Sequence, residues 1–190
     1  LFSGDELVKV FDLKRVQKSG AVFNLEKLDW LNAQYIKRLD IAALLSYLND
    51  FIPADWQKKP AVLQKAAEAE RTRMKKLSDF EPAAKFIFEL PEYDAAILIW
   101  NETPRGAILD NLKLIQSSLV GLEDQNFKRL PLEQLIMPHT EIRGRGELLW
   151  PLRVAVSGMA SSPPAFEVME ILGKEETLRR IEIAIEKLSQ

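Results

Sequence analysis

The chain has 190 residues, of which 47% are hydrophobic, so it can bury a core as one large or two small domains, and disorder is not expected. A net charge of −2 excludes nucleic-acid binding through a global positive field, but it leaves room for a local basic face. The absence of cysteine excludes disulfides and thiolate metal sites, and a single histidine, His139, excludes a His-rich metal site.

No segment of the sequence indicates a membrane or a secretory route. The longest apolar stretch, residues 95–100, is far too short to cross a bilayer, and no signal-peptide pattern is present. We therefore expect a cytoplasmic protein with no membrane partner. Because the first residue is leucine, we also expect the chain to be an excised fragment.

The N-terminal part predicts two helices joined by a loop. Ser3 and Glu6 have the spacing of a capping box ahead of an apolar run. Residues 12–23 mix apolar and basic side chains without a period, which predicts a loop. A helix is predicted after this loop, because apolar residues then recur at helical spacing. Its apolar face consists of Leu25, Leu28, Leu31, Tyr35 and Leu39.

The next part of the chain predicts three more helices. Asp40 can cap a helix over residues 41–48. Residues 61–77 are rich in Ala, Glu, Lys and Arg and contain neither Gly nor Pro, which predicts one continuous helix. Ser78 and Glu81 form a second capping-box pattern, which predicts the start of the third helix.

The middle of the chain is harder to interpret. Residues 95–100 are compatible with a strand or with a buried helix, and periodicity cannot decide over so short a run. Thr103-Pro104 predicts the start of a helix that runs to about Glu123. Residues 132–137 predict a short helix, and residues 140–146 predict a loop.

The last part again predicts helices. Residues 148–156 have the side-chain propensity of a strand. Ser162-Pro163 predicts the start of a helix that ends at Gly173, and residues 177–188 form an amphipathic pattern. The strand evidence is thin, so the predicted fold class is all-α, with two helical subdomains that meet near residues 88–91.

No arrangement of residues predicts an active site. His139 follows a proline and has no G-x-S-x-G sequence to accompany it, so a lone surface histidine is the expected role. The one close glycine pair, Gly144 and Gly146, lacks the third glycine and the preceding strand of a phosphate-binding loop. Carboxylates alternate with Lys and Arg on helices, which is typical of a solvated face.

Basic residues beside aromatic ones are a better signal. Proteins read single-stranded RNA by stacking unpaired bases and by hydrogen bonds to their Watson–Crick edges. Arg153 lies between Trp150 and the turn at residues 161–166, where a helix start offers backbone N–H groups. The alternative is that Trp150 and Phe166 belong to the core and that the stem of Arg153 only covers them.

Two blocks of sequence, residues 149–180 (LWPLRVAVSGMASSPPAFEVMEILGKEETLRR) and 23–36 (FNLEKLDWLNAQYI), carry a family resemblance. They resemble, in the same order and at about the same spacing, bacterial-type glutamyl-tRNA synthetases. The first is similar to the end that reads the anticodon, and the second to the junction with the tRNA stem-contacting region. The resemblance implies a cage of α-helices that binds an anticodon, and it makes residues 148–156 helical.

The resemblance also implies roles for individual residues. It places Arg153, Ser162 and Pro163 in the pocket for the first two anticodon bases, with Trp150, Ala165 and Phe166 beside them. Ala165 is smaller than the apolar residue that is common in relatives, which weakens its expected base contact. Trp30 is similar to a family tryptophan that faces the tRNA, and its alternative role is to anchor a helix in the core.

Arg73 resembles the family's reader of the third anticodon base. Cytosine presents two adjacent acceptors, O2 and N3, to the paired donors of a guanidinium, whereas guanine presents a donor at N1. Glutamate anticodons end in cytosine and glutamine anticodons in guanine, so Arg73 would favour glutamate tRNA by about 1–3 kcal/mol. The alternative is a solvated helix arginine that pairs with Glu70.

The resemblance divides the chain into residues 1–39, the end of the stem-contact region, and two helical subdomains, 40–88 and 89–190. It implies a parent glutamate–tRNA ligase that uses ATP and Mg²⁺. The family's ATP-binding and adenylate-forming motifs are absent here, so the chain alone is expected to be inactive and to hold no cofactor or metal. The expected partner is tRNA(Glu), not DNA, and the expected state is a monomer.

Two other functions remain open at this point. One is a helical protein-interaction or regulatory module that does not bind RNA, which the small net charge supports slightly. The other is a synthetase of relaxed specificity that also charges tRNA(Gln), and Arg73 argues against it.

Overall fold

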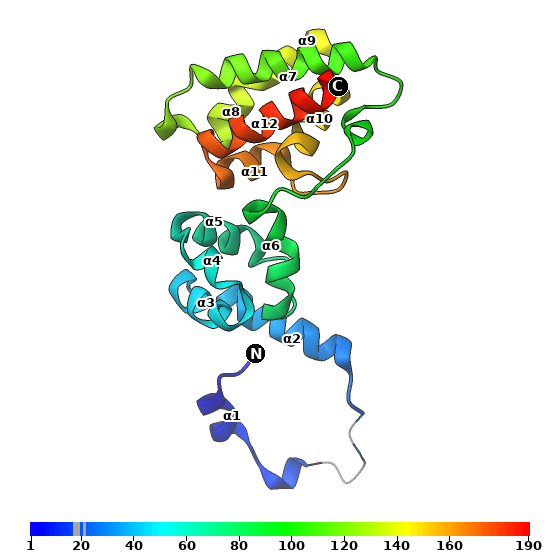
Figure 1. Ribbon diagram of the computed structural model, residues 1–190. Helices are drawn as coiled ribbons and strands as arrows, with labels where there is room; N and C mark the ends of the chain where they lie inside the picture. Colours follow the sequence, from blue (N-terminus) through cyan, green and yellow to red (C-terminus); the bar gives the residue numbers. More distant parts are fainter. Residues whose placement is uncertain (17–19, 21) are drawn as a thin grey trace.

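The computed structural model describes residues 1–16, 20 and 22–190, and these residues form α-helices and short 3-10 turns with no β-strand (Figure 1). The all-α prediction is therefore confirmed. The first helices are α1 (Gly4–Val10), α2 (Leu25–Arg38), α3 (Ile41–Leu48), α4 (Ala54–Gln57), α5 (Pro60–Glu70) and α6 (Phe80–Phe88). The later ones are α7 (Arg105–Val120), α8 (Arg129–Ile136), α9 (Thr140–Arg143), α10 (Arg145–Ser157), α11 (Ala165–Leu172) and α12 (Lys174–Ser189).

Helices α3 to α6 pack together as one group, and α7 to α12 form a second group above them in Figure 1. The segment after α6 leads from the first group to the second. Helix α11 of the second group contacts both α5 and α6. It therefore lies at the junction of the two groups.

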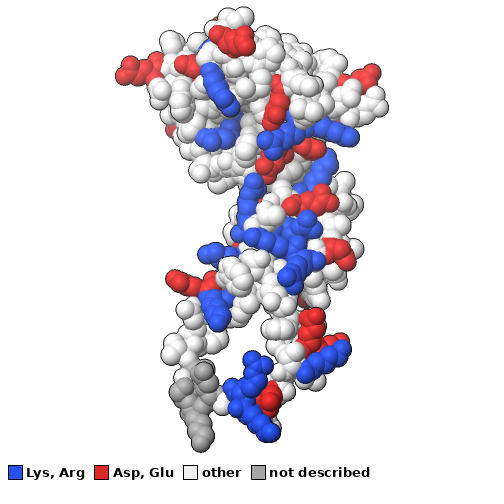
Figure 2. All heavy atoms as spheres, turned by 180° about the vertical axis from the view of Figure 1, so that it is seen from behind, with Lys and Arg blue, Asp and Glu red and all other residues white. Residues whose placement is uncertain are grey.

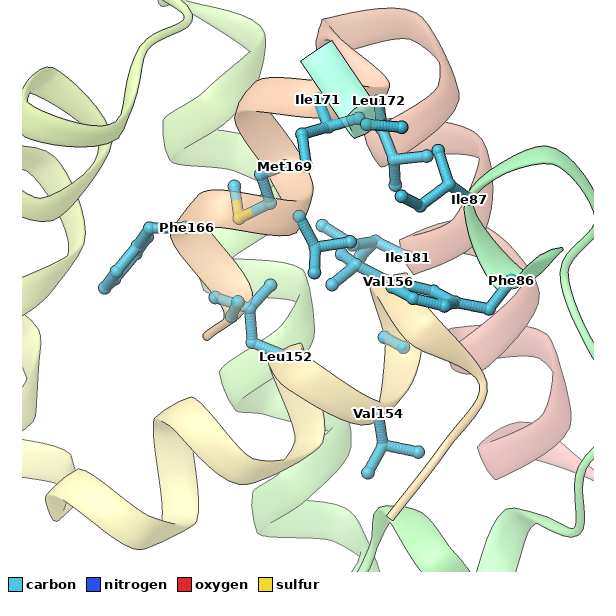
Figure 3. Close-up of a cluster of buried hydrophobic side chains, with 14 of the residues drawn as sticks. Phe86, Ile87, Leu152, Val154, Val156, Phe166, Met169, Ile171, Leu172 and Ile181 are labelled. Atoms are coloured by element: carbon cyan, nitrogen blue, oxygen red, sulfur yellow. The ribbon is translucent and has the colours of Figure 1, made fainter. Parts of the chain in front are cut away.

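The hydrophobic core is continuous across this junction. Phe86 and Ile87 of α6 are buried in the same cluster as Val156 of α10 and Ile181 of α12 (Figure 3). Burial of apolar surface stabilises by about 25 cal/mol per Å², so these contacts hold the two groups of helices together. In the same view the Phe166 side chain points away from the cluster.

A buried arginine lies at the same junction. Arg180 of α12 is fully buried, and its guanidinium donates to the carbonyl oxygens of Phe86 (2.8 Å), Ile87 (2.8 Å) and Val156 (2.7 Å). These carbonyls lie in the last turns of α6 and α10, where helices lack internal donors. The Arg180 Nε atom donates to Glu176 at 2.7 Å, so the buried charge is paired.

Two of the predicted helix caps are present. The Ser3 hydroxyl accepts from the Glu6 backbone N–H at 3.2 Å, and the Glu6 carboxylate accepts from the Ser3 N–H at 2.7 Å. Asp40 accepts from the backbone N–H of Ala43 at 2.8 Å and begins α3. Both short side chains satisfy N–H groups that have no partner within the helix.

Predicted boundaries of three helices are wrong. The helix expected over residues 61–77 ends at Glu70, and a turn follows it. Ser78 does not cap α6, because the Asp79 carboxylate accepts from the N–H groups of Lys75 and Lys76 and a 3-10 turn leads into the helix. Helix α7 ends at Val120 rather than near Glu123. Its N-cap residue is Pro104 rather than Thr103.

Predictions for the irregular segments also need correction. Residues 95–98 form a 3-10 turn, which is neither of the two expected structures, and residues 140–146 contain α9 and the start of α10 instead of a loop. The loop predicted over 12–23 contains a short 3-10 turn, and its residues 17–19 and 21 lie outside the described residues. Residues 148–156 are helical, as the family resemblance implied.

The buried face of α2 differs from the predicted one. Ala33 and Ile36 are buried, whereas Leu25, Leu28 and Tyr35 are exposed. Figure 1 shows the first turns of α2 extending beyond the group formed by α3 to α6, so no packed surface covers them. Periodicity identified the helix correctly but not the side that is buried.

Candidate nucleic-acid interface

A pocket of about 540 Å³ opens between α8, α10 and the start of α11. Aromatic side chains and arginines make up half of the residues in its walls. The lining residues are Trp100, Arg129, Glu133, Met137, Arg145, Gly146, Leu149, Trp150, Arg153, Pro164, Ala165 and Phe166. The pocket thus brings together four residues singled out in the sequence, namely Trp150, Arg153, Ala165 and Phe166.

Trp150 and Arg153 are fixed by their neighbours. The Trp150 Nε1 atom donates to the carbonyl oxygen of Ile97 at 2.8 Å, and its ring centroid lies 5.0 Å from that of Trp100. The Arg153 guanidinium lies 4.5 Å above the Trp150 ring and donates from Nη2 to the Ala160 carbonyl at 2.9 Å. Such a cation–π contact holds the guanidinium against an aromatic wall. Neither Trp150 nor Arg153 is fully buried, so both can meet a ligand.

Gly146 allows Trp100 to line this pocket. A Cβ atom at Gly146 would lie 2.2 Å from Nε1 of the Trp100 ring, which no side chain can tolerate without movement. Trp100 therefore packs directly against the first turn of α10. Sequence reasoning missed Trp100 because the fold brings it beside a glycine that lies far along the chain.

Replacing Gly146 with alanine is expected to push the indole out of place. Overpacking of this kind lowers the free energy of unfolding by about 1–3 kcal/mol, which urea denaturation would measure. Gly106→Ala is a matched control, because Gly106 lies in α7 and a Cβ atom added there would meet no other atom within 4 Å. The control should be neutral or slightly stabilising. Equal stability of the two variants would contradict the packing role of Gly146.

Ser162 and Pro163 lie beside the pocket rather than in its wall. Helix α11 begins at Ala165 with Pro164 before it, so the hydroxyl cap expected from Ser162 is wrong. The Ser162 hydroxyl instead donates to the Pro163 carbonyl at 3.1 Å. A residue that precedes a proline is restricted to extended backbone, so Ser162 and Pro163 stay outside the helix and its start is delayed. Pro164, not Pro163, contributes to the pocket wall.

Arg73 lies in the turn after α5, not on the helix predicted for it. Its Nη1 atom is 3.0 Å from Glu70 and its Nη2 atom is 3.0 Å from Glu167 of α11. The expected competitor Glu70 is therefore present, and Glu167 is a second one that the sequence did not reveal. Burial alone lowers the pKa of Arg73, but the hydrogen bonds and charges of Glu167 and Glu70 raise it overall.

Helix α11 connects Arg73 with the pocket. Phe166 lines the pocket, and the next residue, Glu167, binds Arg73. Glu170 accepts from the backbone N–H of Arg129 at 3.1 Å, and Arg129 is another lining residue. Figure 2 shows basic and acidic side chains interleaved where the two groups of helices meet. One short helix thus supports both candidate base-reading positions.

Trp30 is 57% exposed on α2, so its alternative role as a core anchor is wrong. The same helix is tied to the segment after Arg73, because Asn32 donates to the Lys75 carbonyl at 2.7 Å. An exposed indole on this side can stack on a ligand. Its orientation toward tRNA remains a prediction.

Neither a metal cluster nor a membrane span is found in the described part of the chain. The described residues contain no group of three or more His, Cys, Asp or Glu side chains arranged to hold a metal ion. No helix among them combines the length and apolar character needed to span a bilayer. The arginines and indoles of the pocket suit an anionic, aromatic ligand such as a nucleotide.

A family model described as "Anticodon binding domain" matches residues 40–185. The chain belongs to this anticodon-binding domain family. The match includes the pocket, Arg73 and α11, whereas Trp30 lies before its first residue.

Glutamate–tRNA ligases are among the proteins that are similar to this chain in sequence. A glutamate–tRNA ligase of Lachnoclostridium phytofermentans is 37% identical over 100% of this chain and 39% of its own length. One from Clostridium novyi is 35% identical over 100% of this chain and 40% of its own length. The chain thus spans about two-fifths of these relatives. The resemblance to glutamyl-tRNA synthetases is confirmed.

A solved structure agrees with this assignment. The crystal structure of a glutamate tRNA ligase from Elizabethkingia meningosepticum, in complex with its amino acid, superposes with a TM-score of 0.78 at 29% identity. The superposition covers 97% of this chain and 36% of the ligase chain. The anticodon-binding domain here therefore has the helical arrangement found in a ligase of this kind.

Proposed function

We propose that this chain recognises the anticodon loop of glutamate tRNA as part of a glutamate–tRNA ligase. The observation that carries the proposal is the position of α11, which joins Arg73 to the pocket lined by Trp150 and Arg153. Three adjacent bases of an anticodon need reading positions close to one another, and one helix supports all of them. The parent would attach glutamate to this tRNA with ATP and Mg²⁺.

The pocket suits the first two anticodon bases. A base can stack on Trp150 or Trp100, while Arg153 donates to acceptors on its edge. Ser162 and Pro163 would contact the bases from the adjoining turn, and Ala165 and Phe166 would close the apolar side. Arg145 has no ion-pair partner among the described residues, so it is available for a phosphate.

Arg73 suits the third base, and Trp30 the neighbouring stem. Two of the five N–H donors of a guanidinium are engaged by Glu70 and Glu167, so three remain for a base. We place the divisions of the chain after residues 39 and 88. The domain would act as a monomer in the cytoplasm, and alone it would catalyse no aminoacylation.

Binding of a glutamate anticodon stem-loop tests this proposal. We expect specific binding by fluorescence anisotropy that weakens as salt rises, because arginine–phosphate contacts release counterions. Arg153→Ala should weaken binding by about tenfold or more, since a charge-assisted hydrogen bond to the base edge is lost. Circular dichroism would show that the variant is folded. No binding by the wild-type chain would favour a protein-interaction module instead.

A further inference from the structure

The Arg73 guanidinium is held between two carboxylates of different exposure. Glu70 ends α5 and its side chain is only 7% exposed, whereas the Glu167 side chain is 22% exposed. Glu167 also lines an open hollow of about 300 Å³ beside α5, together with Lys65, Glu68, Ala69, Arg129, Glu170 and Ile171. Of the two carboxylates, Glu167 is therefore the one that a nucleotide can approach.

Arginine alone complements only part of the edge of cytosine. Cytosine presents two acceptors, N3 and O2, beside one donor, the N4 amino group. A guanidinium has donors only, so it cannot accept from this amino group. The Glu167 Oε1 atom binds Arg73, and its Oε2 atom accepts no hydrogen bond from the described residues. The ion pair therefore offers donors and a free acceptor side by side.

We infer that Glu167 is a specificity-determining residue that accepts a hydrogen bond from the N4 amino group of the third anticodon base. This inference rests on the proposed function and deepens it. Arg73 donates to O2 and N3 of the base, and Glu167 completes the complementary edge. Carboxylates are suitable partners for the N4 amino group of cytosine in nucleic-acid recognition.

The same pair would reject uracil and guanine. Uracil and guanine both present a carbonyl oxygen where cytosine presents its amino group, so Glu167 would face an acceptor. An acceptor opposite a carboxylate gains no hydrogen bond and leaves the charge desolvated, which costs affinity. Uracil N3–H and guanine N1–H also face the Arg73 donors, so Glu167 adds to the discrimination of Arg73 against both bases.

A double-mutant cycle between protein and RNA tests this inference. The partners are the full chain, wild type or Glu167→Ala, and a glutamate anticodon stem-loop with cytosine or pyrimidin-2-one at the third position. Pyrimidin-2-one keeps O2 and N3 but lacks the amino group. We expect the wild type to lose about tenfold in affinity on this replacement, as for one charge-assisted hydrogen bond. The Glu167→Ala variant should bind both loops equally.

Two controls make the outcome specific. Glu68→Ala removes the same charge from the same hollow without touching Arg73, and it should retain the tenfold difference between the loops. Glu167→Gln keeps an acceptor at the same place, so it should retain part of the difference between the loops. This variant replaces Glu167→Ala in the cycle if the alanine variant fails to fold.

Each other outcome overturns a defined part of the account. Equal binding of both loops by the wild type would show that the amino group is not read. A tenfold difference that persists in Glu167→Ala would reduce Glu167 to a positioning residue for Arg73. In both cases a wild-type preference for cytosine over guanine would leave the proposed function intact. Loss of that preference would overturn the proposed function itself.

Discussion

Arg180→Ala is expected to lower the free energy of unfolding by about 3–5 kcal/mol, because buried carbonyls lose their donor and a fully buried side chain leaves a cavity. The substitution leaves the carbonyls of Phe86, Ile87 and Val156 buried without their donor. It also removes a partner of Glu176. Small domains are stable by only about 5–15 kcal/mol, so a substantial part of the stability would be lost. Urea denaturation followed by circular dichroism measures the change.

Arg179→Ala is the matched control for this variant. Arg179 also pairs with Glu176, through Nε at 2.7 Å, but its side chain is 54% exposed. Exposed ion pairs contribute about 0–1 kcal/mol, so this neighbour should matter little. If Arg180→Ala costs no more than Arg179→Ala, the two groups of helices are not held together by the buried guanidinium.

Arg73→Gln is expected to remove the contribution of Arg73 to the preference for cytosine over guanine at the third anticodon position, leaving only the part that Glu167 contributes. A good bidentate contact is worth about 1–3 kcal/mol, which is about 5- to 150-fold in the ratio of the two dissociation constants. Glutamine can donate and accept, so it no longer rejects the N1 donor of guanine. Anisotropy titrations with the two stem-loops give the ratio directly.

Lys75→Gln is the control for Arg73→Gln, because it also removes one positive charge, two residues further along the chain. Lys75 is exposed, and its side chain has no ion-pair partner among the described residues. Loss of a lysine that contacts only phosphate weakens binding to both loops by the same factor, because phosphates carry no sequence information. A ratio that changes in Lys75→Gln but not in Arg73→Gln would contradict the assignment of Arg73.

The sequence predicted those parts of the fold that depend on neighbouring residues. The caps at Ser3 and Asp40 follow from side chains that reach N–H groups three residues away. The amphipathic pattern over 177–188 lies within α12, which begins slightly earlier, at Lys174. Residues 148–156 are different, because β-propensity favoured a strand and only the family resemblance predicted the helix.

The errors arise where distant contacts decide the local structure. Residues 61–77 have strong helix propensity, yet the chain turns after Glu70. There Arg71 donates to the Leu39 carbonyl at 3.2 Å and Arg73 pairs with Glu167, and both contacts are between segments far apart in sequence. Tertiary contacts of this kind override propensity.

The candidate site was predicted only in part for the same reason. Trp150, Arg153, Ala165 and Phe166 were found because a family motif contains them, and the fold brings them to one pocket. Trp100 and Glu167 belong to no local motif, so a single sequence carries no signal for them. They are recognised only when Gly146 and Arg73 are seen beside them.

The most direct test is a crystal structure of this chain bound to a glutamate anticodon stem-loop. We expect the first two anticodon bases in the pocket beside Trp150 and Arg153, and the third base against Arg73 with its amino group toward Glu167. An anticodon held elsewhere on the domain, with the pocket empty and no base against Arg73 and Glu167, would contradict the account.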